Sequence, residues 1–237
     1  MDKGKVYDRK IEQIIKAEKV LSILLIGAGA NIEKSSFNTL RDIDLFVITD
    51  ENYEFQREVA ESEGVLFDIS YMSLKSFEKG IDEKLSFLIN SLQKCRIVYN
   101  INKSLQEFLE KIKSLHEIGP PKLENDEVNY IRYKLYQDYE DILSRKDDVL
   151  NVSFLINNLF YNILASYFKL NGYWMPKDKK ILNNIEKIDN TLYILCKDFI
   201  QEDYNSKLEK LDEILNYVLK PYGGTIKFWK RKKFPLI

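Results

Sequence analysis

The chain has 237 residues, and 45% of them are hydrophobic, which is ordinary for a globular protein. Its 36 lysines and arginines nearly balance its 37 aspartates and glutamates, so no net positive charge favours duplex nucleic acid or an anionic membrane. Cys95 and Cys196 are too few and too far apart for a disulfide framework or a zinc motif. The first twenty residues lack the apolar run of a signal peptide, and apolar stretches fall short of a bilayer span. We therefore expect a cytoplasmic protein with no membrane partner.

The first half of the chain alternates between helix-like and strand-like segments. Apolar and β-branched runs predict four strands, at residues 22–26, 42–50, 64–73 and 95–100. Helical spacing or polar composition predicts helices at residues 6–20, 52–63, 74–92 and 105–115. Residues 30–41 are polar and are expected to be irregular.

The second half of the chain begins at Gly119-Pro120-Pro121, which is the clearest linker signal. Beyond it no segment has the pattern of a strand. Helices are expected at residues 125–143, 152–170, 190–200 and 204–219, and Pro176 is suited to the first turn of another. The predicted fold class is α+β: a small mixed β-sheet with flanking helices in residues 1–118, followed by an all-α helical bundle in residues 119–237.

Two aspartates open the second predicted strand. Because side chains alternate across a strand, Asp42 and Asp44 lie on one face while Ile43 lies on the other. Two ionised carboxylates about 7 Å apart repel each other, and a divalent cation between them removes that penalty. Oxygen ligands of this kind suit Mg²⁺, which is often held by one or two carboxylates plus substrate phosphates. The sequence therefore predicts a metal site at the start of this strand.

A third aspartate, Asp68, interrupts the next apolar strand. A carboxylate in the middle of a sheet is costly unless it has a partner or a metal. If the two strands are neighbours, Asp68 completes a cluster of three carboxylates that suits a two-metal site for phosphoryl transfer. Each aspartate alone is also compatible with a turn or a strand edge. The order of the segments favours the metal site.

Small residues follow the first predicted strand, in the stretch Gly27-Ala28-Gly29-Ala30. Such residues let the backbone approach a ligand closely, and successive backbone N–H groups can then bind phosphate oxygens. We expect this turn to hold the phosphates of a nucleotide.

Residues 25–47 resemble the signature of the polymerase-β-like nucleotidyltransferase superfamily: an apolar residue, a glycine turn, a spacer of about a dozen residues, then Asp-apolar-Asp-apolar. The stretch FDISYMSLKSFEKGI is similar to the strand of the third carboxylate and its following helix. The helical second half is similar, more loosely, to that of bacterial aminoglycoside and lincosamide nucleotidyltransferases and to HEPN-like helical partners. The resemblance implies Mg²⁺ as cofactor, bound by Asp42, Asp44 and Asp68, and ATP or another nucleoside triphosphate as co-substrate.

The resemblance also implies the reaction and the acceptor. A nucleoside monophosphate, first of all AMP from ATP, would pass to a hydroxyl of a small molecule such as an antibiotic, which would confer resistance. Asp68 would bind a metal or take the acceptor proton. Lys179 or Lys180, after Trp174-Met175-Pro176, would face the triphosphate, although a solvated helix start explains these lysines equally well. RNA and a protein side chain remain open as alternative acceptors. A homodimer remains open as the oligomeric state.

Two departures from the signature leave room for an alternative function, although the three intact carboxylates argue against it. Where the family has serine after the glycine, this chain has Ala28 or Ala30, and Ser35 or Ser36 could replace the lost hydroxyl. The residue before Asp42 is Arg41, which could contact phosphate or be solvated. The alternative is a non-catalytic or antitoxin-like interaction protein that keeps the fold.

Other polar residues have ordinary structural explanations. Asp138, Glu140 and Asp141 could include a general base, but a solvated helix face explains them better. The segment 227–234 is basic with aromatic residues between the charges, and a packed or solvated terminus is its expected role.

Overall fold

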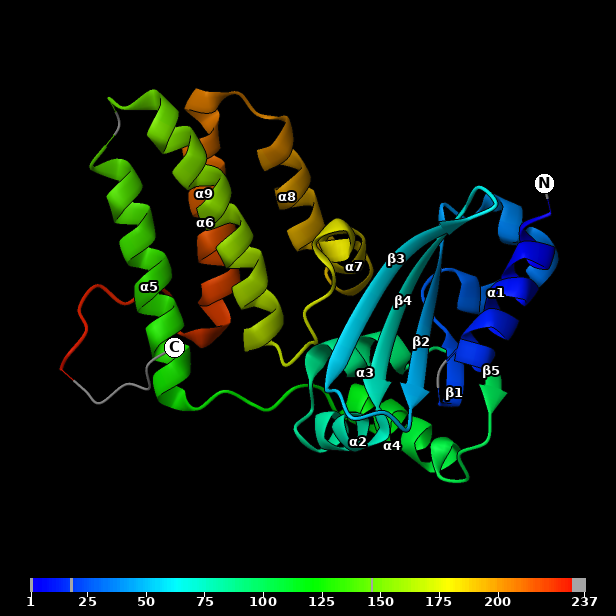
Figure 1. Cartoon of the computed structure of the whole chain (residues 1–237). Helices are drawn as coiled ribbons and strands as arrows, with labels where there is room; N and C mark the ends of the chain where they lie inside the picture. The colour runs from blue at the N-terminus through cyan, green and yellow to red at the C-terminus, as the bar shows by residue number, and fades with distance from the viewer. Residues whose placement is uncertain (1, 18, 146, 232–237) are drawn as a thin grey trace. The chain divides into compact units, whose positions relative to one another are not determined.

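The computed structural model describes residues 2–17, 19–145 and 147–231. The chain divides into two compact units, Met1–Gly119 and Pro120–Ile237, and each is described by itself. The first unit holds a mixed sheet with flanking helices and the second is helical (Figure 1). The α+β fold class predicted from the sequence is confirmed.

The sheet of the first unit has five strands in the order β3-β4-β2-β1-β5. Their bounds are β1 Val20–Leu25, β2 Asp42–Thr49, β3 Phe55–Ser62, β4 Val65–Ser73 and β5 Arg96–Asn100. Strands β2 and β4 are parallel, whereas every other neighbouring pair is antiparallel. The two parallel central strands are those that carry the three predicted aspartates.

Different helices cover the two faces of the sheet. One face is covered by α1 (Lys3–Ala17) and the 3-10 segment η2 (Lys34–Thr39), which pack on the buried, odd-numbered side chains of β2 and β4. The ring of Tyr7 in α1 contacts that of Phe37 in η2 edge to face. On the other face Phe46 of β2 packs on Phe77 of α2 (Leu74–Asp82), which packs on Phe108 of α4 (Leu105–Ile118). The side chains of β2 and β4 with even numbers, including the aspartates, belong to this second face.

The prediction of a polar helix at residues 52–63 is wrong. This segment forms β3, which pairs with β4 from Phe55↔Met72 to Ser62↔Val65. The hairpin turns at Glu63 and Gly64, whose φ angles of 47° and 70° are those of a turn that matches the strand twist. The exposed polar side chains that suggested a helix suit an edge strand, because charge on an edge discourages pairing with another chain.

The helix expected at residues 74–92 is in fact two helices. α2 ends at Asp82 and α3 spans Ser86–Leu92, and Lys84 between them has a φ of 54°. The N–H groups of Leu88 and Ile89 bond to the carbonyl of Leu85, so the chain restarts its helix there. The break lets α3 pack beside α4 rather than continue along the axis of α2.

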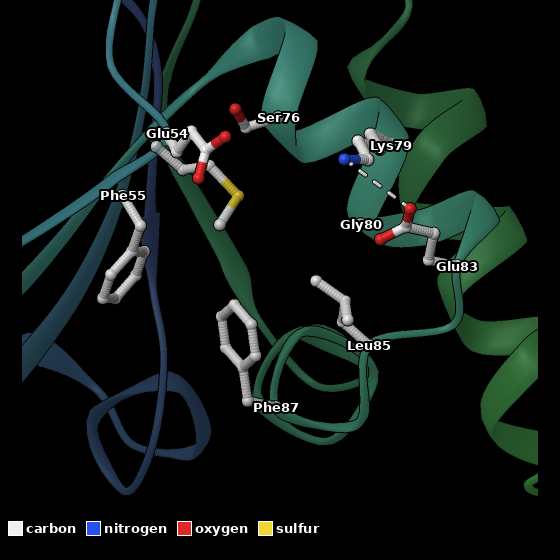
Figure 2. A pocket seen from close by; sticks show the side chains of 9 residues that line it. Glu54, Phe55, Ser76, Lys79, Gly80, Glu83, Leu85 and Phe87 are labelled. Atoms are coloured by element: carbon white, nitrogen blue, oxygen red, sulfur yellow. Dashed lines mark ion pairs between the residues drawn. The ribbon is translucent and has the colours of Figure 1, made fainter. Parts of the chain in front are cut away.

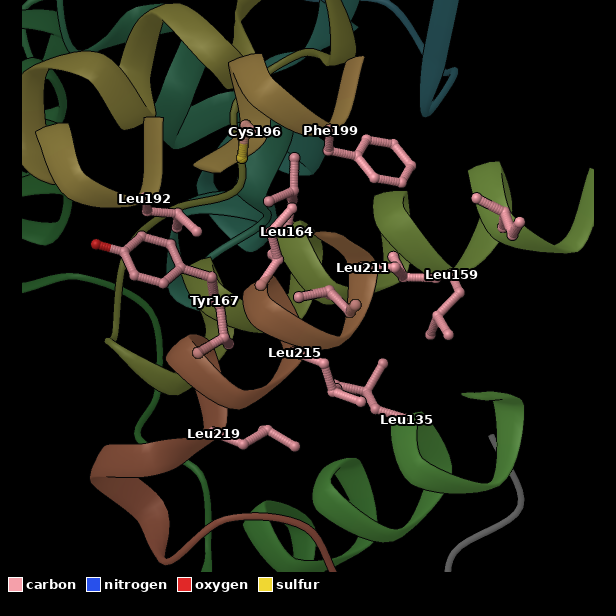
Figure 3. Close-up of a cluster of buried hydrophobic side chains, with 14 of the residues drawn as sticks. Leu135, Leu159, Leu164, Tyr167, Leu192, Cys196, Phe199, Leu211, Leu215 and Leu219 are labelled. Atoms are coloured by element: carbon pink, nitrogen blue, oxygen red, sulfur yellow. The ribbon is translucent and has the colours of Figure 1, made fainter. Parts of the chain in front are cut away.

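The second unit consists of five α-helices joined by short segments among residues 120–145 and 147–231. They are α5 Asn125–Leu143, α6 Val149–Leu170, α7 Ile181–Ile188, α8 Asn190–Gln201 and α9 Tyr204–Leu219. Their apolar faces meet in one core, where Leu135, Leu164, Leu211 and Leu215 are buried (Figure 3). The expected helix start at Pro176 is wrong, because only a 3-10 turn, η3 (Asp178–Lys180), precedes α7.

Helix α6 also corrects the expectation about apolar length. Its 22 residues are long and apolar enough to cross a membrane by length and composition alone. Seven of its side chains are nevertheless buried against other helices of the second unit, among them Val152, Ile156 and Ile163. The helix thus supplies a side of the core, while Leu150 and Phe154 stay exposed.

Candidate nucleotide-binding site

The three predicted aspartates lie on one face of the sheet. Asp44 of β2 is directly opposite Asp68 of β4 in the parallel register, and Asp42 is two residues earlier on the same side of β2. All three are half-buried, because α2 and α4 cover this face further along the strands and leave its beginning open. We call this part of the sheet, marked by Asp42, Asp44 and Asp68, the carboxylate face.

Asp68 is held by an arginine that sequence reasoning did not single out. Arg57 of β3 donates from Nε and Nη2 to the two carboxylate oxygens of Asp68, at 2.8 and 2.5 Å. The Asp68 side chain is 21% exposed and that of Arg57 is 59% exposed. Hydrogen bonding to Asp68 and the charge of Asp68 raise the pKa of the Arg57 guanidinium, and the charge of Asp44 adds to the effect. The Arg57 guanidinium therefore neutralises Asp68 and is also attracted by the charge of Asp44.

The turn after β1 lies against Asp44. The N–H of Ile26 bonds to the carbonyl of Asp44 at 3.0 Å, which brings the following residue, Gly27, beside the aspartate side chain. A Cβ at Gly27 would lie 2.3 Å from Oδ2 of Asp44, and the φ of Gly27 is +66°. Only glycine meets both conditions without displacing the carboxylate. The small residue at this position is thus required by the carboxylate itself.

The remaining residues of the predicted phosphate-binding turn have different roles. Gly27 and Ala28 are exposed, so their backbones are open to a ligand. Gly29 is buried, and a Cβ there would lie 3.2 Å from Leu25, so this glycine serves packing. Ala30 is half-buried in the 3-10 turn η1 (Gly29–Asn31). The exposed backbone next to Asp44 is therefore that of Gly27 and Ala28.

Other predicted residues lie near the site or in the second unit. Arg41 is exposed directly before Asp42, where its contact with phosphate stays a prediction. Ser35 and Ser36 are exposed in η2. Lys179 and Lys180 are exposed in η3 of the second unit, so their role toward a triphosphate also stays a prediction.

The acidic residues of α5 and the basic C-terminal segment behave as structural residues. Asp138 pairs with Lys134 and Asp141 with Arg145, each one helical turn away. Trp229 packs its ring on Tyr130 and Tyr133, at 5.5 and 5.8 Å between centroids. Lys232 to Phe234 lie outside the described residues.

The fit of these residues to a metal ion is partial. Within residues 2–17, 19–145 and 147–231, no group of three or more His, Cys, Asp or Glu side chains is arranged to hold one. Asp42 and Asp44 meet the usual requirement for Mg²⁺, which takes one or two carboxylates and completes its shell with phosphates and water. Asp68 would join them only by leaving Arg57. Asp42 and Asp44 are therefore the residues that fit the ion best.

A pocket of about 390 Å³ lies beyond the carboxylates on the same side of the sheet. Its apolar wall consists of Phe55 of β3, Met72 of β4, Leu85 and Phe87 (Figure 2). We call it the aromatic pocket, because the rings of Phe55 and Phe87 meet edge to face at 5.7 Å. Sequence reasoning missed it because residues 52–63 were expected to be helical, which hid the pairing of Phe55 with Met72.

Comparison with known proteins shows the fold. No protein-family model matches the chain, and no curated protein sequence matches it either. It is similar to the crystal structure of a nucleotidyltransferase-like protein from Exiguobacterium sibiricum 255-15, with a TM-score of 0.50 and 10% identity, over 92% of this chain and 74% of that one. At this identity the likeness concerns the fold alone, and function must be argued from the site. The chain therefore has a nucleotidyltransferase-like fold.

Proposed function

We propose that the protein is a metal-dependent nucleotidyltransferase that transfers a nucleoside monophosphate to a hydroxyl group. The observation that carries the proposal is the in-register pair Asp44 and Asp68 on parallel strands, with Asp42 on the same face. The turn at Gly27 lies directly against Asp44 and exposes its backbone. Carboxylates for a divalent cation and amides for phosphate oxygens thus meet at one place, as binding of a metal–nucleotide complex requires.

The residues divide the chemistry between them. Asp42 and Asp44 would hold Mg²⁺, which when bound neutralises phosphate charge and orients the triphosphate. The backbone N–H groups at Gly27 and Ala28 bind the β- and γ-phosphates. The acceptor oxygen forms a bond to the α-phosphorus, the bond from that phosphorus to the bridging oxygen breaks, and pyrophosphate leaves. The proton of the acceptor hydroxyl passes to a base, for which Asp68 is the candidate.

The substrates follow from the same reasoning. ATP is the first co-substrate to test, and a hydroxyl-bearing small molecule, such as an aminoglycoside or lincosamide antibiotic, is the first acceptor. The near balance of 36 basic and 37 acidic residues supports a small acceptor over RNA, since phosphate backbones favour positively charged surfaces.

A second candidate function is favoured by one feature of the site. Arg57 bonds to both carboxylate oxygens of Asp68. The carboxylate face therefore already holds a positively charged side chain where an active transferase needs a bound metal ion. A protein that kept the fold for an interaction would retain such a pair, because an unpaired carboxylate on a half-buried sheet face is costly. In that case no metal-dependent nucleotide binding is expected.

The substitution Asp44→Asn tests the proposal. It removes a ligand charge while keeping the size of the side chain, so we expect binding of Mg²⁺ with ATP, followed by calorimetry, to be lost. Transfer to an accepted hydroxyl should fall roughly hundredfold or more, the effect of losing about 2.7 kcal/mol of transition-state stabilisation. Asp50→Asn, at the exposed residue that directly follows the same strand, is the matched control and should behave as wild type. Equal activity in Asp44→Asn and Asp50→Asn would contradict the proposal.

A further inference from the structure

The aromatic pocket has a defined position relative to the carboxylates. Met72 in its wall and Asp68 are both on β4, four residues apart, and therefore point to the same face. At about 3.3 Å per residue the two positions are separated by about 13 Å along the strand. Arg57 and Ser70, which pair across β3 and β4, lie between them. The pocket and the carboxylate face are thus two ends of one strip of sheet surface.

The Gly27 turn lies on the β1 side of the aspartates, level with Asp42 and Asp44. It follows β1, which is antiparallel to β2, so it is beside the beginning of β2. The aromatic pocket is near the end of β4, which runs parallel to β2. Across the sheet, in the strand order β1-β2-β4-β3, the glycine turn is therefore followed by Asp44, by Asp68, and by the side of the sheet where β4 and β3 carry the pocket residues Met72 and Phe55.

From this order we infer that the aromatic pocket binds the apolar end of the acceptor, an inference that rests on the proposed function. In phosphoryl transfer the attacking and leaving oxygens are roughly in line with the phosphorus between them. With the β- and γ-phosphates at the Gly27 turn, pyrophosphate leaves toward the turn. The acceptor oxygen must then arrive from the other side of the aspartates, which is the side of β4 and β3, the two strands that carry the pocket residues Met72 and Phe55.

The lining of the pocket defines the chemical class of the acceptor. Phe55, Phe87, Leu85 and Met72 offer an apolar wall for a ring or a branched hydrocarbon group. The acceptor therefore carries such a group away from the hydroxyl that reacts, because the pocket residue Met72 is about 13 Å from Asp68 along β4. A highly polar sugar with no apolar part would leave this wall without a partner. Of the two antibiotic classes proposed first, the lincosamides therefore fit the pocket better than the more polar aminoglycosides.

The charged residues at the rim add a preference. Among the described lining residues there are two carboxylates, Glu54 and Glu83, and one ammonium, Lys79. Lys79 and Glu83 are 3.7 Å apart on one helical turn, so each reduces the field of the other. The remaining charge is negative, and a neutral or cationic acceptor is favoured over an anionic one.

A binding experiment on the full chain tests the inference with naphthylethanol as the probe and naphthylacetate as its anionic counterpart. Phe87→Ala removes one wall of the pocket, and because Phe87 is 46% exposed the fold should tolerate the change. In a titration observed by NMR, we expect its Kd for naphthylethanol to rise about tenfold or more. Phe55→Ala should act in the same way. Naphthylacetate should bind the wild type more weakly than naphthylethanol.

Two control variants separate this inference from the proposed function. Phe154→Ala removes an aromatic side chain of α6 that is 64% exposed, and it should bind naphthylethanol like the wild type. Asp44→Asn should also bind the probe normally but lose binding of Mg²⁺ with ATP, whereas Phe87→Ala should keep that binding. With an accepted substrate, Phe87→Ala should raise KM and leave kcat nearly unchanged, because the pocket binds a part of the acceptor that does not react.

Several results would overturn the inference. Wild-type affinity for naphthylethanol in both Phe87→Ala and Phe55→Ala, or no binding to the wild type, would show that the pocket does not take apolar rings. Competition between ATP and naphthylethanol, with weaker ATP binding in Phe87→Ala, would assign the pocket to the nucleobase instead. Absence of Mg²⁺-dependent ATP binding in a wild type that does bind the probe would overturn the proposed function, and the acceptor assignment with it.

Discussion

At the scale of single residues, the site depends on a contact between a glycine and an aspartate. The sequence suggests a role for Gly27 in approaching a ligand, and the structure adds a second role. Gly27 leaves space for Oδ2 of Asp44, which a Cβ would meet at 2.3 Å. The position of the Asp44 carboxylate, the proposed metal ligand, is therefore set from the neighbouring turn as well as from its own strand.

The substitution Gly27→Ala tests this contact. Its Cβ would strain the backbone at a φ of +66° and push the Asp44 carboxylate away. We expect a loss of about 1–2 kcal/mol in the free energy of unfolding, together with weaker Mg²⁺-dependent ATP binding. Gly172→Ala is the matched control, because Gly172 has a φ of +67° but no atom within 4 Å of its Cβ position. If both variants bind ATP with wild-type affinity, the contact has no part in the site.

Asp68 shows what residue-level reasoning can and cannot supply. A carboxylate within an apolar strand needs a partner, so the sequence alone predicts that Asp68 has one. Its observed partner, Arg57, is in a segment that was expected to be helical, and in the β3–β4 pairing it lies opposite Ser70, two residues along β4 from Asp68. The identity of the partner depends on how β3 pairs with β4, which no local pattern around Asp68 encodes.

At the scale of elements, one aspartate joins three helices of the second unit. Asp189 caps α8 by accepting the N–H of Leu192 at 2.9 Å, and it also accepts the hydroxyls of Tyr167 in α6 and Tyr217 in α9, at 3.1 and 3.0 Å. Burial raises the pKa of Tyr167, and the charge of Asp189 raises it further. Both tyrosines therefore remain neutral donors, and the three helices share one acceptor.

We expect Asp189→Ala to be strongly destabilising. It removes the N-cap of α8, which contributes about 1 kcal/mol, and leaves two partly buried hydroxyls without this acceptor, at about 1 kcal/mol or more each. Chemical denaturation should show a loss of roughly 2–4 kcal/mol in the free energy of unfolding. Asp148→Ala removes the exposed cap of α6, whose carboxylate accepts from the backbone and side chain of Asn151, and should cost about 1 kcal/mol. Similar losses in the two variants would refute the role of the tyrosines.

Strand β3 is the element that sequence reasoning missed, and the reason is physical. Glutamate, glutamine and alanine in residues 52–63 favour a helix in isolation. The segment is a strand because it completes the ladder of β4 across the Glu63-Gly64 turn. Tertiary pairing outweighed local propensity here, as it often does on edge strands. The wrong assignment also concealed Arg57 and Phe55, which lie on that strand.

At the scale of the whole molecule, each unit has its own core. The buried cluster that includes Val6, Ile43 and Phe67 belongs to the first unit, and the cluster that includes Leu135, Ile163 and Leu215 belongs to the second. Among the residues that the structure describes, neither cluster draws from the other unit. A unit of this size with a closed core meets the usual requirement for folding alone.

We therefore expect residues 1–119 and residues 120–237, produced separately, to fold. Each should unfold cooperatively in denaturant with a stability of about 5 kcal/mol or more. Circular dichroism should show mixed helix and strand in the first fragment and helix in the second. A fragment 1–119 without a cooperative transition would mean that its core needs the second unit.

The sequence alone determined the α+β class, the approximate place of most helices and strands, and the sharing of one strand face by Asp42 and Asp44. These properties follow from the local period of a strand or helix, which a few consecutive residues define. Only the tertiary structure decided that β3 is a strand, that Arg57 holds Asp68, that Gly27 makes room for Asp44 and that Phe55 meets Phe87. These contacts join residues distant in sequence, and their existence depends on strand order and register, which are set by the packing of the whole sheet.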